Sequence, residues 1–258
     1  MENFSPSSSS APESRIHISV PIYIPIIIGA SLVIAAALGS YTFYAVRSLD
    51  NVLSVTGSAK THVTADTVKW RISVTRKVSE FALQSGYPIL AKDVKDVQTF
   101  LKANAVADDA VTVSPVFVEE MYNYNSNNGS APRQFNLREE ITVTSKDVHA
   151  IDALSKNINS ELADKGIFIS NNWLEFYVSN LADLRVSLLA DAVKDAKARA
   201  TEIAKAGGTK VGALKSASSG VVQVLAPNSI EVTDYGTYDT QSLEKDVMVT
   251  ARATFFVQ

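Results

Sequence analysis

The sequence predicts an α+β fold, with one or more mostly antiparallel sheets and three packed helices, preceded by one transmembrane helix. Short segments alternate apolar and polar residues as half-buried strands do, and longer segments keep the apolar spacing of three to four residues that is typical of helices. Pairs of strands separate these helices, which favours hairpins over a doubly wound parallel sheet. The 29 residues from Ile18 to Val46 contain no Asp, Glu, Lys or Arg.

The N-terminal part is interpreted as a tail followed by a membrane anchor. Residues 1–15 are rich in Ser and Pro, so we expect them to be disordered. Residues 16–46 form the anchor, with the span at about residues 24–46, because about 20 apolar residues cross about 30 Å of hydrocarbon. The alternatives are a cleaved signal peptide, whose apolar run is usually shorter and more basic at its start, and a buried helix. Arg15 and Arg47 flank the run, so charge leaves its orientation open.

Small residues recur at every fourth position of this segment. They are Ser31, Ala35 and Gly39. Such a stripe allows two membrane helices to approach closely, so it is a candidate packing face. Small residues are common in membrane spans, and a chance occurrence is the alternative.

The first half of the remaining chain predicts four strands and a helix. A strand over residues 51–58 is followed by one over 65–78, in which Val68, Trp70, Ile72 and Val74 share one face. Residues 80–105 predict a helix that begins or kinks at Pro88. Residues 111–121 and 135–145 predict a long hairpin, with Pro115 at a sheet edge or bulge.

The loop of that hairpin, residues 122–133, is a candidate protein-contact loop. Tyr and Asn are adaptable contact residues, and the loop carries Tyr122, Tyr124, Asn125, Asn127 and Asn128. A flexible hairpin tip is the alternative interpretation.

The second half predicts a helix over residues 147–165, a strand over 167–178 and an alanine-rich helix over 181–206. Gly207 and Gly208 end this last helix, and strands follow over 221–225 and 247–257 with a loop over 227–242 between them. The predicted order is therefore β-β-α-β-β-α-β-α-β-β. Both Trp70 and Trp173 are expected in the core.

Composition excludes several classes of protein. Residues 47–258 carry 23 Lys+Arg (24 less Arg15) and 25 Asp+Glu (27 less Glu2 and Glu13), a net charge of −2. A nucleic-acid-binding protein usually has a basic excess, so we expect no nucleic-acid partner. The absence of Cys excludes disulfides, thiol catalysis and Cys-ligated metal. With three His in the chain, a His-rich metal site is not expected either.

No motif predicts catalysis, a cofactor or a metal. Residues 206–216 contain glycines, but these close a helix and lack the G-K-[ST] ending of a phosphate loop. His62 lies near Asp66 in sequence, yet no G-x-S-x-G elbow presents a serine to such a pair. His149 is expected at the surface. The acidic pairs at 119–120 and 139–140 are interpreted as solvated hairpin charges, because adjacent strand residues point to opposite faces.

Several segments together resemble the SIMPL domain family. Val55-Thr56-Gly57-Ser58-Ala59 and Ala65-Asp66-Thr67 are similar to the family's V-T-G-x-G/A and P-D-x-A strands. The helix over 191–206, with Gly207-Gly208 and Val211-Gly212 after it, and the last strand over 246–257 resemble the family's C-terminal part. The sequence departs from the pattern at Thr64-Ala65, where Pro is common, and at Ala103-Asn104-Ala105-Val106, where Gly-Ile is frequent.

The resemblance implies a bacterial protein that is secreted or tethered outside the inner membrane, and it implies no catalytic residues. Some members, the periplasmic immunogenic antigens among them, form large ring- or channel-like oligomers. We therefore expect a non-enzymatic protein with a cytoplasmic N-terminus and a periplasmic or extracellular domain over residues 47–258. It would contact the lipid bilayer, further copies of itself or an envelope protein. A module that binds a small envelope ligand is the second hypothesis, and a hydrolase with an unrecognised site is the third.

Overall fold

The computed structural model describes residues 21, 23–48, 51–121, 132–229, 233 and 235–258. Its first element is the helix α1 (Tyr23–Ser48). From Tyr23 to Arg47 this helix is long and apolar enough to cross a membrane, and none of its most apolar stretch is buried. The span predicted at about residues 24–46 is therefore a helix of the predicted length. The predicted tail, residues 1–15, lies outside the described residues.

Residues Leu53–Gln258 form a separate compact unit. Every buried hydrophobic residue of the described chain lies between Val55 and Phe255. The unit therefore has its own core. A fragment that begins at residue 47 contains all the residues that this core requires.

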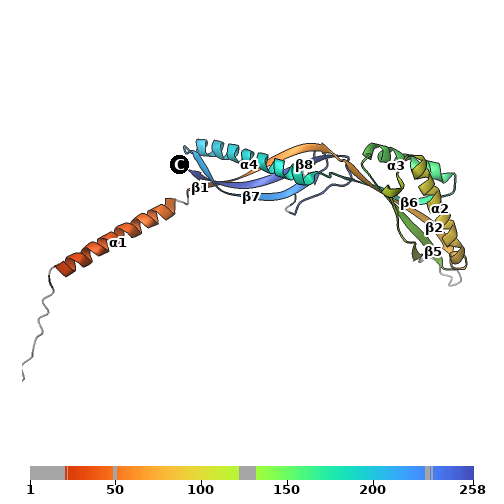
Figure 1. Ribbon diagram of the computed structural model, residues 1–258, viewed down its shortest axis with the longest axis horizontal. Coiled ribbons are helices and arrows are strands. Elements are labelled where there is room, and N and C mark those ends of the chain that lie inside the picture. The colour runs from red at the N-terminus through yellow and green to blue at the C-terminus, as the bar shows by residue number, and fades with distance from the viewer. Residues whose placement is uncertain (1–20, 22, 49–50, 122–131, 230–232, 234) are drawn as a thin grey trace, which may run out of the picture. The chain divides into compact units, whose positions relative to one another are not determined.

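One part of the unit is a five-stranded sheet with two helices on one face (Figure 1). Its strands are β2 (Thr67–Ser79), β3 (Val111–Val113), β4 (Phe117–Met121), β5 (Gln134–Ser145) and β6 (Phe168–Tyr177). The order is β3-β5-β2-β6, with β4 also paired to β5, and these pairs are antiparallel. The helices are α2 (Leu83–Ala103) and α3 (Val148–Ala163). This β-α-β-β-α-β arrangement is a split β-α-β fold.

The predicted hairpin is confirmed, with one interruption. The strand predicted over residues 111–121 is divided around Pro115 into β3 and β4, which both pair with β5 and lie at the sheet edge. A proline lacks the N–H that a central strand would have to donate, so an edge position suits it. Pro88 lies inside α2, after a short 3₁₀ turn over Glu80–Ala82.

The core of this part lies between the sheet and its helices. Val68, Trp70, Ile72 and Val74 are all fully buried there, as their alternation predicts. Trp70 Nε1 donates to Asn172 Oδ1 at 2.6 Å, and Asn172 Nδ2 donates to the Ser155 carbonyl at 2.7 Å. A buried indole N–H needs such a partner.

The prediction that Trp173 lies in the core is wrong. Trp173 is 43% exposed, because Leu174 and Phe176 alternate with it and point toward the core instead. On α2, Ile89 is 47% exposed, and Leu90 is the buried residue at this turn.

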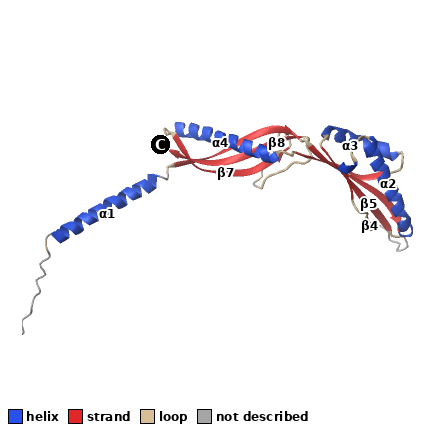
Figure 2. Ribbon diagram, in the orientation of Figure 1, coloured by secondary structure: helices blue, strands red, loops and turns tan. Residues whose placement is uncertain are grey.

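The other part of the unit is a three-stranded sheet covered by one helix (Figure 2). The strands β1 (Val52–Thr64), β7 (Val211–Leu225) and β8 (Glu244–Val257) follow the order β1-β8-β7. The helix α4 (Leu181–Ala206) lies along one face and buries a row of small side chains: Ala192, Ala196, Ala200 and Ala204. Ile203 lies outside this buried row and is 51% exposed.

Gly57 of β1 fixes how closely α4 approaches this sheet. A Cβ at this position would lie 2.2 Å from the Ala192 carbonyl oxygen and 2.3 Å from the Ala196 amide nitrogen. Only a residue without a side chain fits between the strand and the helix backbone. This contact explains why a glycine follows Val55 and Thr56 in β1.

Two strands of this sheet are longer than predicted. β1 continues past Ser58 to Thr64, and β7 begins at Val211 instead of Val221. Both extensions carry residues that matter for the site described below.

Backbone hydrogen bonds connect the two sheets. In the segment before β8, the Thr237 carbonyl accepts from Val224 N at 2.7 Å, and the Thr240 carbonyl accepts from Phe176 N at 2.7 Å. Asp66, between β1 and β2, accepts from both the backbone N–H and the hydroxyl of Ser179, just before α4. The connections β1–β2, β6–α4 and β7–β8 therefore meet at one junction.

Candidate functional site

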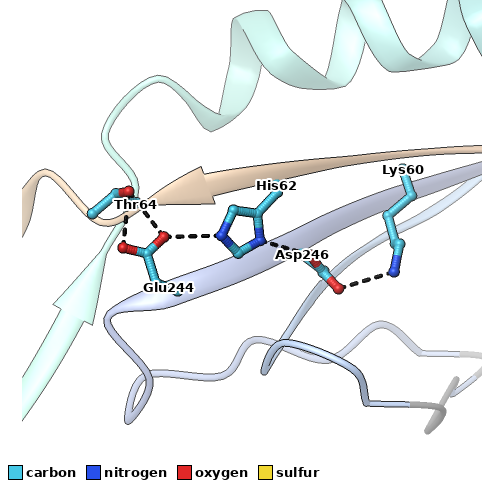
Figure 3. Close-up of polar contacts among 5 residues, drawn as sticks. All are labelled: Lys60, His62, Thr64, Glu244 and Asp246. Carbon is cyan, nitrogen blue, oxygen red and sulfur yellow. Dashed lines mark hydrogen bonds and ion pairs between the residues drawn. The ribbon is translucent and has the colours of Figure 1, made fainter.

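A cluster of polar side chains lies between β1 and β8, on the face of the three-stranded sheet away from α4 (Figure 3). Lys60, His62 and Thr64 come from β1, and Glu244 and Asp246 come from β8. Alternate residues of a strand point to the same face. Ala59 and Val63 of β1 pack in the core under α4. The residues that alternate with them, Lys60, His62 and Thr64, therefore face outward.

His62 lies between two carboxylates. Its Nδ1 is 3.0 Å from Asp246 Oδ1, and its Nε2 is 3.0 Å from Glu244 Oε2. Lys60 Nζ donates to the other oxygen of Asp246 at 2.9 Å, and the Thr64 hydroxyl donates to Glu244 Oε2 at 2.9 Å. A chain of polar contacts therefore runs from Thr64 to Lys60 across both strands.

These contacts favour the charged forms of His62 and Asp246. The hydrogen bond with Asp246, supported by the charges of Glu244 and Asp246, raises the pKa of His62 above its usual 6.5. Hydrogen bonds from His62 and Lys60 lower the pKa of Asp246. An imidazole donates from both nitrogens only when it is protonated, so the geometry fits an imidazolium.

This arrangement suits attachment of β1 to β8 better than proton transfer to a substrate. With a carboxylate on each ring nitrogen, His62 has no nitrogen left to accept a proton from a hydroxyl. The hydroxyl of Thr64 donates to Glu244. Asp66, the residue close to His62 in sequence, bonds Ser179 and Thr67 instead. Within the described ranges, no group of three His, Asp or Glu is placed to hold a metal ion.

The structure places the other predicted residues as follows. The candidate loop residues Tyr122, Tyr124, Asn125, Asn127 and Asn128 all lie outside the described residues. Ser31, Ala35 and Gly39 are exposed on α1, and their role as a packing face stays a prediction. The Ser31 hydroxyl donates to Ile28 O of its own helix.

The remaining sequence motifs add no second site. Glu119 lies opposite Asn136 and Glu120 opposite Phe135, so the two acidic pairs do not face each other. Glu139 lies opposite Val74, and burial raises its pKa. His149 is exposed, as predicted, and Gly207 and Gly208 lie between α4 and β7.

The second notable feature is the outer edge of β7. Seven consecutive residues, Ala213–Ser219, are exposed. No strand of the described chain pairs with this edge, apart from a single bridge between Val224 and Tyr238. The edge of β1 differs, because the Ser58 amide there donates to Asp195 Oδ2 of α4 at 2.8 Å. Helix α4 thus covers part of the β1 edge.

A groove of about 890 Å³ adjoins β7 near its C-terminal half. It is lined by the first residues of α4, by β7 and by the following loop, including Leu181, Arg185, Val221, Gln223 and Tyr235. Gln223 is buried and holds the loop, since its amide donates to Thr233 O and accepts from Thr237 N.

Comparison with known proteins gives one family. The family described as "SIMPL: Protein of unknown function (DUF541)" matches residues 53–255, which is 203 of the 258 residues and nearly the whole compact unit. No curated protein matches the chain.

Proposed function

The chain belongs to the SIMPL family, whose function is unknown, and we propose that it acts without catalysis, as a membrane-anchored envelope protein that assembles with copies of itself through β7. In this proposal α1 remains as the anchor. The N-terminus is cytoplasmic, and residues 47–258 lie on the periplasmic or extracellular side. The charges that flank α1 nearly cancel and do not indicate an orientation. The family resemblance is what supports this one.

The observation that carries the proposal is the exposure of Ala213–Ser219. These residues are exposed at seven consecutive positions, and the outer edge of β7 presents backbone groups that no strand of the described chain pairs. An exposed strand edge is a template for a further strand. Proteins usually protect such an edge with charges, but Ala213–Leu225 contains a single charged residue, Lys215.

The stretch is compatible with pairing to itself. In an antiparallel pair centred on Ser216, Ala213 lies opposite Ser219 and Lys215 opposite Ala217, so no like charges face each other. Lys215 meanwhile lies over its own Phe256 ring, 5.5 Å from the centroid. Such pairing gives a two-fold symmetric dimer, the commonest form of soluble oligomer. The two three-stranded sheets would then become one continuous sheet.

The proposal is tested by the absolute mass of residues 47–258, measured by light scattering across a range of concentrations. We expect a dimer, or a multiple of a dimer, that dissociates on dilution. Replacing Ser216 and Ser218 together by Glu should yield monomers at every concentration, because like charges would then face each other across the new pair.

A matched control adds the same charge elsewhere. Ser160 on α3 and Ser187 on α4 are exposed helix residues, and changing both to Glu should leave the mass unchanged. Circular dichroism of both double variants verifies that they fold. A wild-type fragment that stays monomeric throughout, or one whose mass is insensitive to the β7 changes, would contradict the proposal. A multimer that forms without β7 would instead indicate contacts through the loops or through another envelope protein.

The environment of His62 supports the absence of catalysis in this proposal. Both ring nitrogens of His62 contact carboxylates, and the neighbouring hydroxyl of Thr64 donates to Glu244. A general base needs a nitrogen within reach of the proton that it abstracts.

A small-ligand-binding module is the second candidate, favoured by the groove beside β7. Its volume is within the range of ligand pockets, and Arg185 and Gln223 offer polar groups in a partly apolar surface. A thermal-shift screen of small anions and metabolites tests it, with Arg185→Ala as the control. A compound that stabilises the wild type and not this variant would support the module, and a screen without any hit would oppose it.

A further inference from the structure

The five-stranded sheet has one face that no element of the described chain covers. Helices α2 and α3 both pack on the opposite face (Figure 1), where Val68, Trp70, Ile72 and Val74 are buried. The uncovered side, called the open face below, is formed by the alternate residues of the strands. On β2 it carries Lys69, Arg71, Ser73, Thr75 and Lys77.

Three aromatic side chains project from the open face. Phe168 is 65% exposed, Phe117 is 53% exposed and Trp173 is 43% exposed. The strand register locates them. Phe117 lies opposite Arg138, Arg138 opposite Thr75, and Thr75 opposite Phe168, so these four residues form one row across four strands. Neighbouring strands are about 4.8 Å apart, so the two phenylalanines are about 14 Å apart.

Trp173 lies further along β6, opposite Arg71 of β2. Arg71 is held by Glu175, with Nη2 3.1 Å from Oε2. Arg138 lies over the Phe117 ring, 5.7 Å from its centroid. The rings are therefore separated from one another by polar and charged side chains that already have defined partners.

Beside Phe168, on the side away from Trp173, the open face is hollowed. A depression of about 440 Å³ has seven lining residues: Thr75, Arg76, Lys77, Met121, Asn136, Phe168 and Ser170. Thr75 is only 5% exposed and lies at its floor. The depression combines one exposed ring with two hydroxyls, an ammonium, an amide and the guanidinium of Arg76, which is paired with Asp93.

The charges of the open face nearly balance. By register it carries four cations, Lys69, Arg71, Lys77 and Arg138, and three anions, Glu119, Glu140 and Glu175. A surface for a polyanion, such as a nucleic acid or an anionic membrane, would show a clear basic excess. The core of a protein interface is instead a contiguous apolar patch depleted of charge, which these separated rings do not provide.

We propose that the open face binds a neutral glycan strand, with sugar rings stacked on Phe168 and Trp173 and their hydroxyl or acetamido groups bonded in the depression. The C–H face of a pyranose ring is apolar and matches the face of an aromatic ring, whereas its edge is lined by hydroxyls. Trp173 and Phe168 are separated along β6, and the polar groups of Thr75, Lys77 and Asn136 follow beside Phe168, so rings and polar groups alternate along this face as they do along a sugar chain. The site is independent of β7 and of the self-assembly proposed above.

Trp173 provides the experiment. The chain contains only two tryptophans, and Trp70 is fully buried, so a ligand on the open face changes the emission of Trp173 alone. The full chain is titrated in a detergent without a sugar headgroup, using N-acetylglucosamine oligosaccharides and, separately, maltose oligosaccharides. We expect a saturable change in emission with at least one of these glycans.

Variants distinguish binding on this face from other effects. Phe168→Ala should weaken binding at least tenfold, and it should fold normally because the ring is mostly exposed. Trp173→Phe should abolish the fluorescence signal while calorimetry still detects binding, since a ring remains. Tyr87→Ala, which removes an exposed ring from α2, should have no effect. Absence of saturation with both glycans, or binding unchanged by Phe168→Ala, would overturn the proposal.

Discussion

His62 and Asp246 make the β1–β8 contact dependent on pH. The pKa of His62 is raised in the folded protein, so its stabilising contribution is fully present below about 6.5 and is lost as the pH rises through the raised value. The pKa of Asp246 is lowered, so its contribution is present above its usual 3.8 and is lost as the pH falls through the lowered value. Both contributions are present together in weakly acidic solution.

We therefore expect the melting temperature of residues 47–258 to fall as the pH is raised from 6.5 to 8. The fall should be clearly smaller in His62→Gln, which cannot carry the charge. Circular dichroism melts at a series of pH values measure this. His149→Gln is the control, because that histidine is exposed and should leave the profile unchanged. Parallel profiles for the wild type and His62→Gln would show that His62 does not fasten the strands.

Ala105 has a backbone conformation that favours glycine. Its φ is 63°, and it lies just after α2. The left-handed region costs an L-residue roughly 1–2 kcal/mol, and replacing this residue with Gly removes that cost. Part of the gain in stability is lost again, because Gly makes the unfolded chain more flexible. Ala105→Gly should therefore raise the free energy of unfolding by about 0.5–1 kcal/mol.

Urea denaturation measures this difference. The control is Ala198→Gly on the exposed side of α4, which should lower the stability by about 1 kcal/mol because Gly is a poor helix former. If Ala105→Gly also destabilises the protein, the positive φ is not the source of strain.

The contact between β1 and α4 depends on the missing side chain of Gly57. Gly57→Ala places a methyl group against the backbone of Ala192 and Ala196, which cannot move aside as a flexible side chain would. Overpacking typically costs about 1–3 kcal/mol, and a clash with helix backbone belongs at or above the upper end.

Gly207→Ala is the matched control for this prediction. Its added Cβ meets nothing closer than 3.5 Å and its φ is unremarkable, so urea denaturation should show little change. Equal stabilities for Gly57→Ala and Gly207→Ala would mean that α4 lies further from β1 than the structure shows.

Elements with a regular apolar period were predictable from the sequence, and the others were not. The alternation around Trp70 identified β2, and apolar spacing identified α2, α3 and α4. The first part of β7 was missed because Gly212–Gly220 is made mostly of Gly, Ala and Ser, which have low strand propensity. Pairing with β8 makes this segment a strand.

The polar cluster could not be predicted for a different reason. His62 and Asp246 are 184 residues apart, and the register that joins β1 to β8 has no local signal. The nearby Asp66 is the obvious partner in sequence, but it bonds Ser179 instead. The exposure of Trp173 could not be predicted either. Its apolar ring indicates a core position, but its position on β6 faces outward.

At the scale of the whole molecule, α1 and the β7 edge act together in the proposed assembly. Anchoring confines the domains to a surface and so raises their effective concentration, which allows a modest strand-to-strand contact to hold. The fragment without α1 should therefore associate more weakly than the full chain in a bilayer.

Amide hydrogen exchange of residues 47–258 at low and high protein concentration tests the central claim most directly. A strand amide that gains a partner is protected from exchange. We predict that peptides covering Ala213–Ser219 exchange more slowly as the concentration rises, while peptides from α2 and β6 do not change. Exchange over Ala213–Ser219 that is the same at all concentrations, while the particle mass increases, would contradict assembly through β7.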